Sequence, residues 1–118
     1  MPQAYQEMSS DTKYKSHLLG KWCDIEELAE VFRVNLMNDI LDNDVTYLYI
    51  SKLTRLWLEL QPLMQGRTDM KAMEKTFSDF RPYYYNPMLL MNDENSDKIF
   101  KLEECLREAL HRLGVTYM

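Results

Sequence analysis

Residues 70–80 read Met-Lys-Ala-Met-Glu-Lys-Thr-Phe-Ser-Asp-Phe, and this stretch decides the fold class. Its large apolar residues are spaced three and four apart and are Met70, Met73, Phe77 and Phe80. Because an α-helix has 3.6 residues per turn, this spacing places all four side chains on one stripe and the polar residues opposite. The stretch predicts an amphipathic helix that packs one face against a core.

Three further segments have the same spacing, and together they predict an all-α, four-helix bundle-like domain. Their inward stripes are Ile25, Leu28, Ala29, Phe32, Leu36 and Ile40 in the first, Tyr49, Ile50, Leu53, Trp57, Leu60 and Met64 in the second, and Ile99, Leu102, Leu106, Ala109, Leu110 and Leu113 in the last. Residues 45–50 suit a strand by propensity. We predict helix there because the helical period continues through the segment.

The N-terminal part of the chain has weaker signals. Residues 1–10 are polar without a period, so we predict a flexible N-terminus followed by a single helical domain over residues 11–118. A short extra helix is predicted from residue 11 to Gly20, where glycine favours a helix end. Asp24 followed by Glu27 forms a capping box, which predicts that the first long helix begins at that point.

Single residues predict the other helix ends. Asp44 and Asp69 are suited to cap the second and third helices, because their carboxylates can accept hydrogen bonds from free backbone N–H groups. Pro62 lies inside the second apolar pattern and predicts an end or a kink near residues 59–61. Gly114 stands where a left-handed cap would end the last helix, with Val115 as its hydrophobic partner.

Charge is unevenly distributed along the chain. The formal net charge is -5 over 118 residues, and residues 24–44 alone sum to -6. Binding to nucleic acid normally needs clustered Lys and Arg that displace phosphate counterions, so the net acidity argues against it without excluding a local basic patch. A protein partner is the better match to this charge.

The cysteines and the hydropathy bear on the compartment. Cys23 and Cys105 are far apart in sequence and too few for a disulfide framework, which favours a reducing environment. No run approaches the length of a membrane-spanning helix, and residues 1–10 lack the pattern of a signal peptide. We expect a soluble, cytoplasmic protein that does not bind a membrane.

Residues 25–41 resemble the helix-turn-helix of small transcription regulators. Ala29 and Val34 occupy the positions that this motif prefers for small and branched residues. Arg33, however, replaces the turn glycine, and the segment equivalent to the recognition helix carries Asp39 and Asp42 but no Lys or Arg. The resemblance implies a DNA-binding regulator as the alternative function. The other interpretation of the segment is one continuous amphipathic helix.

Two acidic patterns match metal sites in part. Oxygen-bearing side chains fit positions 1, 3, 5 and 12 of a calcium loop, namely Asp93, Asn95, Asp97 and Glu104, but Lys98 stands where such a loop needs its glycine. Glu108 and His111 have the spacing of a di-iron ligand pair, but the other histidine, His17, has no Glu three residues before it. We therefore predict no metal and no cofactor.

No arrangement of residues predicts catalysis. Cys105 and His111 are six residues apart on one helix and point to different faces, so they do not form a nucleophile–base pair. The three glycines are not grouped, which excludes a glycine-rich phosphate loop. We predict a protein that is not an enzyme and has no small-molecule substrate.

The unusual stretch is residues 81–91, Arg-Pro-Tyr-Tyr-Tyr-Asn-Pro-Met-Leu-Leu-Met. Its two prolines predict a loop before the last helix, and its Tyr, Met and Arg are the residues that protein interfaces concentrate. The stretch is either an intramolecular lid across the bundle end or a partner-binding surface. The residues that we predict to bind a partner here are Tyr83, Tyr84, Tyr85 and Met88.

A second apolar stripe on the first long helix consists of Val31, Val34, Met37 and Leu41. A small bundle seldom needs two apolar faces on one helix, so we predict that Val34 and Met37 contact a partner or a second copy. The function predicted from these surfaces is non-enzymatic. We expect an adaptor, scaffold or inhibitor-type protein that is a homo-oligomer or a subunit of a complex.

Overall fold

Helices account for nearly all of the residues that the computed structural model describes, which are 2–40, 42–90 and 96–115, with the backbone alone for residues 2–12 and Pro87. The α-helices are α1 (Pro2–Met37), α2 (Asn43–Met64), α3 (Lys71–Asp79), α4 (Arg81–Tyr85) and α5 (Ser96–Arg112), and the 3₁₀ turns are η1 (Thr68–Met70) and η2 (Pro87–Leu90). The predicted all-α class is confirmed.

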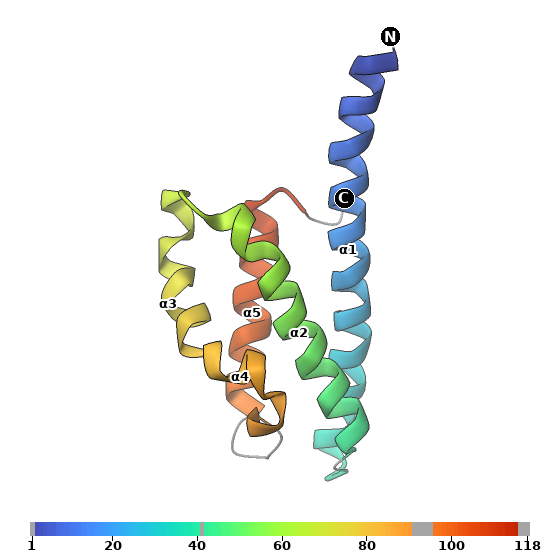
Figure 1. Ribbon diagram of the computed structural model, residues 1–118. Coiled ribbons are helices and arrows are strands. Elements are labelled where there is room, and N and C mark those ends of the chain that lie inside the picture. The colour runs from blue at the N-terminus through green and yellow to red at the C-terminus, as the bar shows by residue number, and fades with distance from the viewer. Residues whose placement is uncertain (1, 41, 91–95, 116–118) are drawn as a thin grey trace.

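The helices pack side by side in a bundle (Figure 1). α1 and α2 form an antiparallel hairpin, α5 packs against α2 and α3, and α4 and η2 lie across α2. At a rise of about 1.5 Å per residue, α1 is about 54 Å long. The molecule measures 56 Å along its longest axis, so α1 alone accounts for that length. Its N-terminal end extends past the other helices (Figure 1).

The stripe in residues 70–80 faces the core as predicted. Met70, Met73, Phe77 and Phe80 are all buried. Burying one such side chain stabilises the fold by about 1.5–3 kcal/mol. The inward stripe of α2 is buried as well, and so is that of the last helix apart from Leu113, which is partly buried, so the helical period identified most of the core.

The predicted break between the short N-terminal helix and the first long helix is wrong. α1 continues through both Gly20 and Asp24, and the capping box lies in its interior. A glycine inside a helix costs only about 0.5–1 kcal/mol relative to alanine. That cost is offset because Leu18, Trp22 and Ile25 flank the glycine and are buried on one stripe.

The ends of α2 also differ from the predictions. Asp42 rather than Asp44 caps its N-terminus, with Oδ1 accepting hydrogen bonds from the N–H groups of Asp44 and Val45 at 3.1 and 3.2 Å. Pro62 does not end the helix, which runs on to Met64. Proline costs one backbone hydrogen bond there, and the burial of Met64 favours completing the last turn.

Asp69 does not cap α3 directly but lies in the 3₁₀ turn η1 that precedes it. The predicted end of α5 is confirmed. Gly114 has a φ of 80°, and the N–H of Val115 donates to Leu110 O at 2.8 Å while the Val115 side chain is buried. This is the glycine cap with its hydrophobic contact.

One charged residue, Glu103, lies inside the core with a side chain that is 1% exposed. Its Oε2 accepts a hydrogen bond from Arg33 Nη2 of α1, and Arg107 Nη2 lies 4.0 Å away. The Arg33 guanidinium also lies 5.1 Å from the centre of the Phe100 ring. Burial and the Glu103 charge together raise the pKa of the Tyr49 hydroxyl far above its usual range. The ion pair between Arg33 and Glu103 joins α1 to α5 through the core.

A second polar contact joins α1 to α2 nearer the surface. Glu59 accepts hydrogen bonds from His17 Nε2 at 2.8 Å and from Lys21 Nζ at 2.9 Å. Partial burial raises the pKa of Glu59, but the hydrogen bonds from Lys21 and His17 outweigh that effect and leave the pKa below its ordinary value. The charged form of Glu59 therefore stabilises the folded state.

We expect Glu59→Gln to lower the free energy of unfolding by about 0.5 kcal/mol at neutral pH. Because the folded-state pKa is depressed, the contribution is fully present above the unfolded value of about 4.3 and is lost as the pH falls through the folded value. Urea unfolding at several pH values measures this. The two proteins should become equally stable once the pH falls below the depressed pKa of Glu59 in the folded state. A difference in stability that stays constant at every pH would contradict the assignment.

Candidate functional site

The residues predicted to bind a partner lie in two regions of the fold. Tyr83, Tyr84 and Tyr85 belong to α4 and Met88 to η2, and both elements lie across α2. Val34 and Met37 belong to the last turns of α1. The two regions are therefore built from different helices.

The predicted loop over residues 81–90 is helical. Pro82 lies in the first turn of α4, where a backbone N–H has no intrahelical partner, so proline is tolerated. Pro87 begins the 3₁₀ turn η2. The prolines therefore divide the segment into two short helical turns instead of excluding helix, which is where the prediction of a loop is wrong.

A groove of about 370 Å³ lies between α2 and the α3–α4 pair, and we call it the α2–α4 groove. Its lining residues are Trp57, Leu58, Gln61 and Met64 of α2, Gln65 directly after α2, Glu74, Phe77 and Ser78 of α3, and Arg81, Tyr84 and Tyr85 of α4. The floor is aromatic and the rim carries amide, hydroxyl and charged groups. This combination is typical of binding pockets.

Tyr84 forms part of the groove wall and is itself held in place. Its ring stacks on Trp57, with the ring centres 4.3 Å apart and the planes at 14°, and Trp57 contacts Phe77 at 5.2 Å. The Tyr84 hydroxyl donates to Phe77 O at 3.0 Å, and burial raises the pKa of that hydroxyl. Tyr84 therefore has the contacts expected of an intramolecular lid.

Two large side chains at the mouth of the groove are open to solvent beside its polar rim. Tyr85 is 81% exposed although it directly follows the half-buried Tyr84, and Leu58 on the opposite wall is 48% exposed. Met88 and Leu89 of η2 are exposed as well. Tyr85 and Met88 therefore have the exposure expected of a partner-binding surface.

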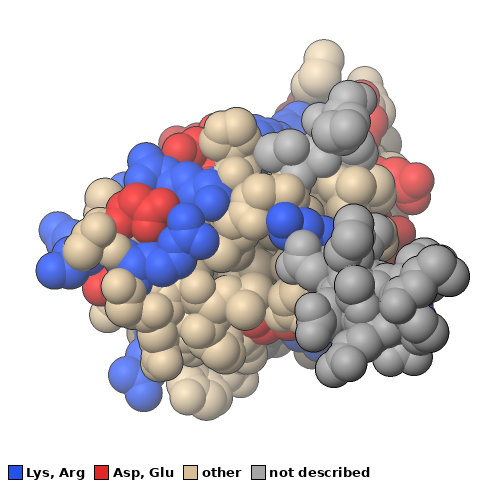
Figure 2. Space-filling view, turned by 90° about the horizontal axis from the view of Figure 1, so that it is seen from above, with Lys and Arg blue, Asp and Glu red and all other residues tan. Residues whose placement is uncertain are grey.

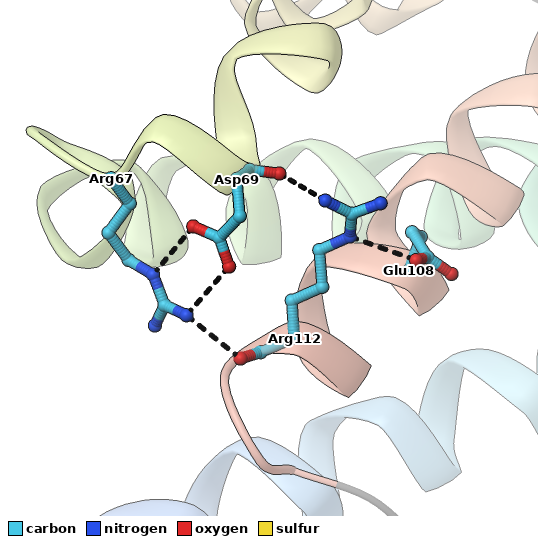
Figure 3. Close-up of polar contacts among 4 residues, drawn as sticks. All are labelled: Arg67, Asp69, Glu108 and Arg112. Carbon is cyan, nitrogen blue, oxygen red and sulfur yellow. Dashed lines mark hydrogen bonds and ion pairs between the residues drawn. The ribbon is translucent and has the colours of Figure 1, made fainter.

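A polar cluster fixes the start of α3 and so the position of the groove wall (Figure 3). Arg67 binds Asp69 through two hydrogen bonds of 3.1 and 2.9 Å and donates to Arg112 O at 3.1 Å. Arg112 in turn donates to Asp69 O and to Glu108. The hydrogen bonds from Arg67 lower the pKa of Asp69.

The two arginines of this cluster come from distant parts of the chain. Arg67 directly precedes η1, and Arg112 is the last residue of α5. Figure 2, which views the end where α3 begins and α5 ends, shows Lys and Arg side chains gathered around acidic ones. Cations near the C-terminus of α5 also match the sign of its dipole. The cluster therefore holds the two helix ends together.

The second region is the outward face at the end of α1. Val31 and Val34 are 45% and 46% exposed, and Met37 and Ile40 are exposed after them. The inward neighbours Ala29 and Phe32 are buried. Val31, Val34 and Met37 are exposed, as a second stripe predicts, but Ile40 was predicted to face inward and is exposed because α1 ends before it, at Met37. That a partner covers this face stays a prediction. Leu41, which shared the predicted stripe, lies outside the described residues.

The segment that resembles a helix-turn-helix has a different geometry. α1 runs without interruption through residues 25–37, and the chain turns only after that, at Asp39 with a φ of 54°. A helix-turn-helix needs two helices joined by a turn inside this segment. The geometry therefore gives the alternative of DNA binding no support.

The remaining sequence patterns bear on metals and membranes. In the part of the chain that the structure describes, no three His, Cys, Asp or Glu side chains lie close enough to hold a metal ion. Asp93 and Asn95 of the calcium-loop pattern lie outside that part. No helix in the described ranges is both long enough and apolar enough to cross a membrane.

Sequence reasoning did not identify the α2–α4 groove or the buried ion pair. Trp57 and Phe77 were assigned to the core, and the sequence gives no sign that their outer edges line a groove. The position of Glu103, in contrast, can be inferred from its spacing in the sequence. It lies four residues after Ile99 and is adjacent to Leu102, so the helical period itself places it on the inner face of α5.

No protein-family model, curated protein or solved structure was found to match the chain.

Proposed function

We propose that this chain is a non-enzymatic interaction protein whose α2–α4 groove receives an apolar segment of a partner protein. The observation that carries the proposal is the pairing of a rigid aromatic wall with an exposed aromatic mouth. Trp57 and Tyr84 are fixed by stacking, while Tyr85 is left 81% exposed beside them. Tyr and Trp are the residues that most often dominate the energy of protein interfaces.

The size and charge of the groove support a protein segment as the occupant. A volume of about 370 Å³ admits anchoring side chains rather than a whole helix. Glu74 and Arg81 on the rim have opposite charges, so the groove favours neither an anion nor a cation. Gln61 and Gln65 can donate to and accept from the backbone of a bound segment.

We propose further that the protein acts in a reducing, cytoplasmic compartment. Cys23 and Cys105 form no disulfide, and Cys105 packs against the core. Burial raises the pKa of the Cys105 thiol to about 11, which makes it a poor nucleophile at neutral pH. The Cys105 thiol is therefore consistent with a structural role rather than a catalytic one.

Photo-crosslinking in the cells that make the protein tests the groove. A benzoylphenylalanine residue in place of Tyr85 should form a covalent adduct with the partner. Leu58→Arg in the same chain should reduce that adduct about tenfold, because the charge would have to be buried at the mouth. Leu58 is half-exposed, so the variant should keep its helical circular dichroism signal.

The matched control places the same photoreactive residue at Tyr47, which is exposed on α2 outside the groove lining. This position should give no adduct of the same mass. Adducts of equal yield at both positions, or an adduct at Tyr85 that Leu58→Arg leaves unchanged, would contradict the proposal.

A further inference from the structure

The wall of the α2–α4 groove that α3 and α4 form is one stripe of side chains. Its exposed lining residues are spaced four, three and four apart in the sequence, namely Glu74, Ser78, Arg81 and Tyr85. Phe80, which lies between the two helices, also has a right-handed helical backbone, so the stripe continues across the junction. The charged, polar and aromatic groups of this wall therefore follow one another in a fixed order along the groove.

The two charged groups of this wall lie at different points along the groove. Glu74 belongs to α3, and Arg81 begins α4 seven residues later. At a rise of about 1.5 Å per residue, this difference in sequence corresponds to about 10 Å along the wall. That is close to the Debye length at physiological salt, about 8 Å, so each charge acts largely by itself on whatever lies beside it. The groove therefore offers one anionic and one cationic binding point.

Both charges are left unpaired by the part of the chain that the structure describes. The Glu74 and Arg81 side chains are exposed, and neither forms an ion pair or a hydrogen bond with a described residue. Lys71 precedes Glu74 by one helical turn and Asp79 precedes Arg81 by two residues, but both lie outside the groove lining. In the polar cluster at the start of α3, by contrast, the charged side chains are paired with one another. The charges of the groove are therefore available to a partner.

The opposite wall favours a segment in an extended conformation. Gln61 and Gln65 lie one helical turn apart on this wall, and both side chains are exposed. Each amide can donate and accept hydrogen bonds, which matches the free N–H and C=O groups of an extended backbone. A helical segment would use those backbone groups within itself. At about 3.3 Å per residue, an extended chain covers about 10 Å in three residues.

We propose that the segment bound in the α2–α4 groove is extended and carries a Lys or Arg beside Glu74 and, three residues away, an Asp or Glu beside Arg81. An apolar side chain between these two charges contacts Trp57. The assignment rests on the proposed function, because it gives the chemistry of the segment that the groove receives. Ion pairs at an exposed rim contribute about 0.2–1 kcal/mol each, so they fix the direction of the segment while the apolar side chain supplies most of the affinity.

Selection from a phage library of random dodecapeptides on the full chain tests the charge order. Peptides recovered on the wild type should share an apolar residue flanked by a basic and an acidic residue three positions apart. Glu74→Gln should select peptides that keep the acidic residue and lose the preference for the basic one. Arg81→Gln should have the opposite effect, because each substitution removes one of the two binding points. Recovered peptides that occupy the groove without this pair of charges would overturn the inference.

Charge reversal on both sides gives the quantitative test. A copy of a selected peptide with its two charged residues exchanged should bind the wild type about tenfold more weakly, because both ion pairs become repulsive. Glu74→Lys with Arg81→Glu should restore the binding of the exchanged copy and weaken that of the selected peptide by the same factor. Fluorescence anisotropy of the labelled peptides measures the four dissociation constants. Equal affinities of both peptides for both proteins would contradict the proposed charge order.

Leu58→Arg distinguishes a failure of this inference from a failure of the proposed function. It places a charge at the groove mouth, so selected peptides should bind it about tenfold more weakly. Peptides that bind this variant as well as the wild type, or a wild type that recovers no common peptide, would contradict the proposed function and the inference together. Peptides that depend on Leu58 but show no charge order would contradict the inference alone.

The matched controls are Asp79→Asn and Lys101→Gln. Both residues are charged and exposed and lie outside the groove lining, so the two variants should recover the same peptides as the wild type and bind them equally. A loss of the charge order in either control would show that the overall charge of the chain, and not Glu74 and Arg81, selects the peptides, and would contradict the inference.

Discussion

We expect Arg33→Met to lower the free energy of unfolding by about 3 kcal/mol, a large share of the stability of a small domain. The substitution leaves the buried carboxylate of Glu103 without its closest partner. Arg107, at 4.0 Å from the same oxygen, compensates for only part of the loss. Urea unfolding followed by circular dichroism measures the change.

The opposite substitution, Glu103→Met, is the matched control. It removes the buried charge and leaves Arg33, whose side chain is 41% exposed and can be hydrated, so the loss should be about 1 kcal/mol or less. The double variant should recover most of the stability lost in Arg33→Met. Equal losses in the two single variants, or a double variant as unstable as Arg33→Met, would contradict the assigned cause.

The fold class and most of the core followed from the helical period because burial depends on that period directly. Met70, Met73, Phe77 and Phe80 share one stripe in the sequence and one buried face in the structure. Gly114 is a comparable case, because a left-handed residue followed by an apolar one satisfies the last carbonyls of α5 locally. Where the deciding interactions are local or periodic, the sequence was sufficient.

Predictions from single residues were less successful because tertiary packing overrode them. Gly20 and the pair Asp24 and Glu27 are good local signals for a helix boundary, yet burial on both sides of them keeps α1 continuous. Pro62 is a further example, since α2 extends past it to bury Met64. Each local preference is worth about 1–3 kcal/mol, which a few buried side chains exceed.

Prediction of the candidate sites from the sequence is limited in the same way by tertiary packing. Exposure of Val34 and Met37 followed from a second stripe on one helix, which sequence periodicity can reveal. The α2–α4 groove could not be predicted, because its walls come from helices whose relative placement depends on contacts distant in sequence. The three tyrosines of α4 are identical in type, and Tyr84 differs from Tyr85 through its stack on Trp57 and its hydrogen bond to Phe77 O.

That distinction leads to the second large expected effect. Tyr84→Ala should lower the free energy of unfolding by about 3 kcal/mol, because it removes a stacked ring from the wall of the groove and a hydrogen bond to Phe77 O. Tyr85→Ala should change it by about 0.5 kcal/mol or less, since that side chain is mostly in solvent. Urea unfolding of the two variants measures both effects.

The intermediate substitution Tyr84→Phe keeps the ring and removes only the hydroxyl, so its loss should be about 1 kcal/mol. The order of stability is then wild type and Tyr85→Ala together, Tyr84→Phe below them, and Tyr84→Ala lowest. Partner binding should follow a different order, because Tyr85→Ala should weaken it without loss of stability. If Tyr84→Ala were as stable as Tyr85→Ala, the stack on Trp57 would not be what holds the groove wall in place.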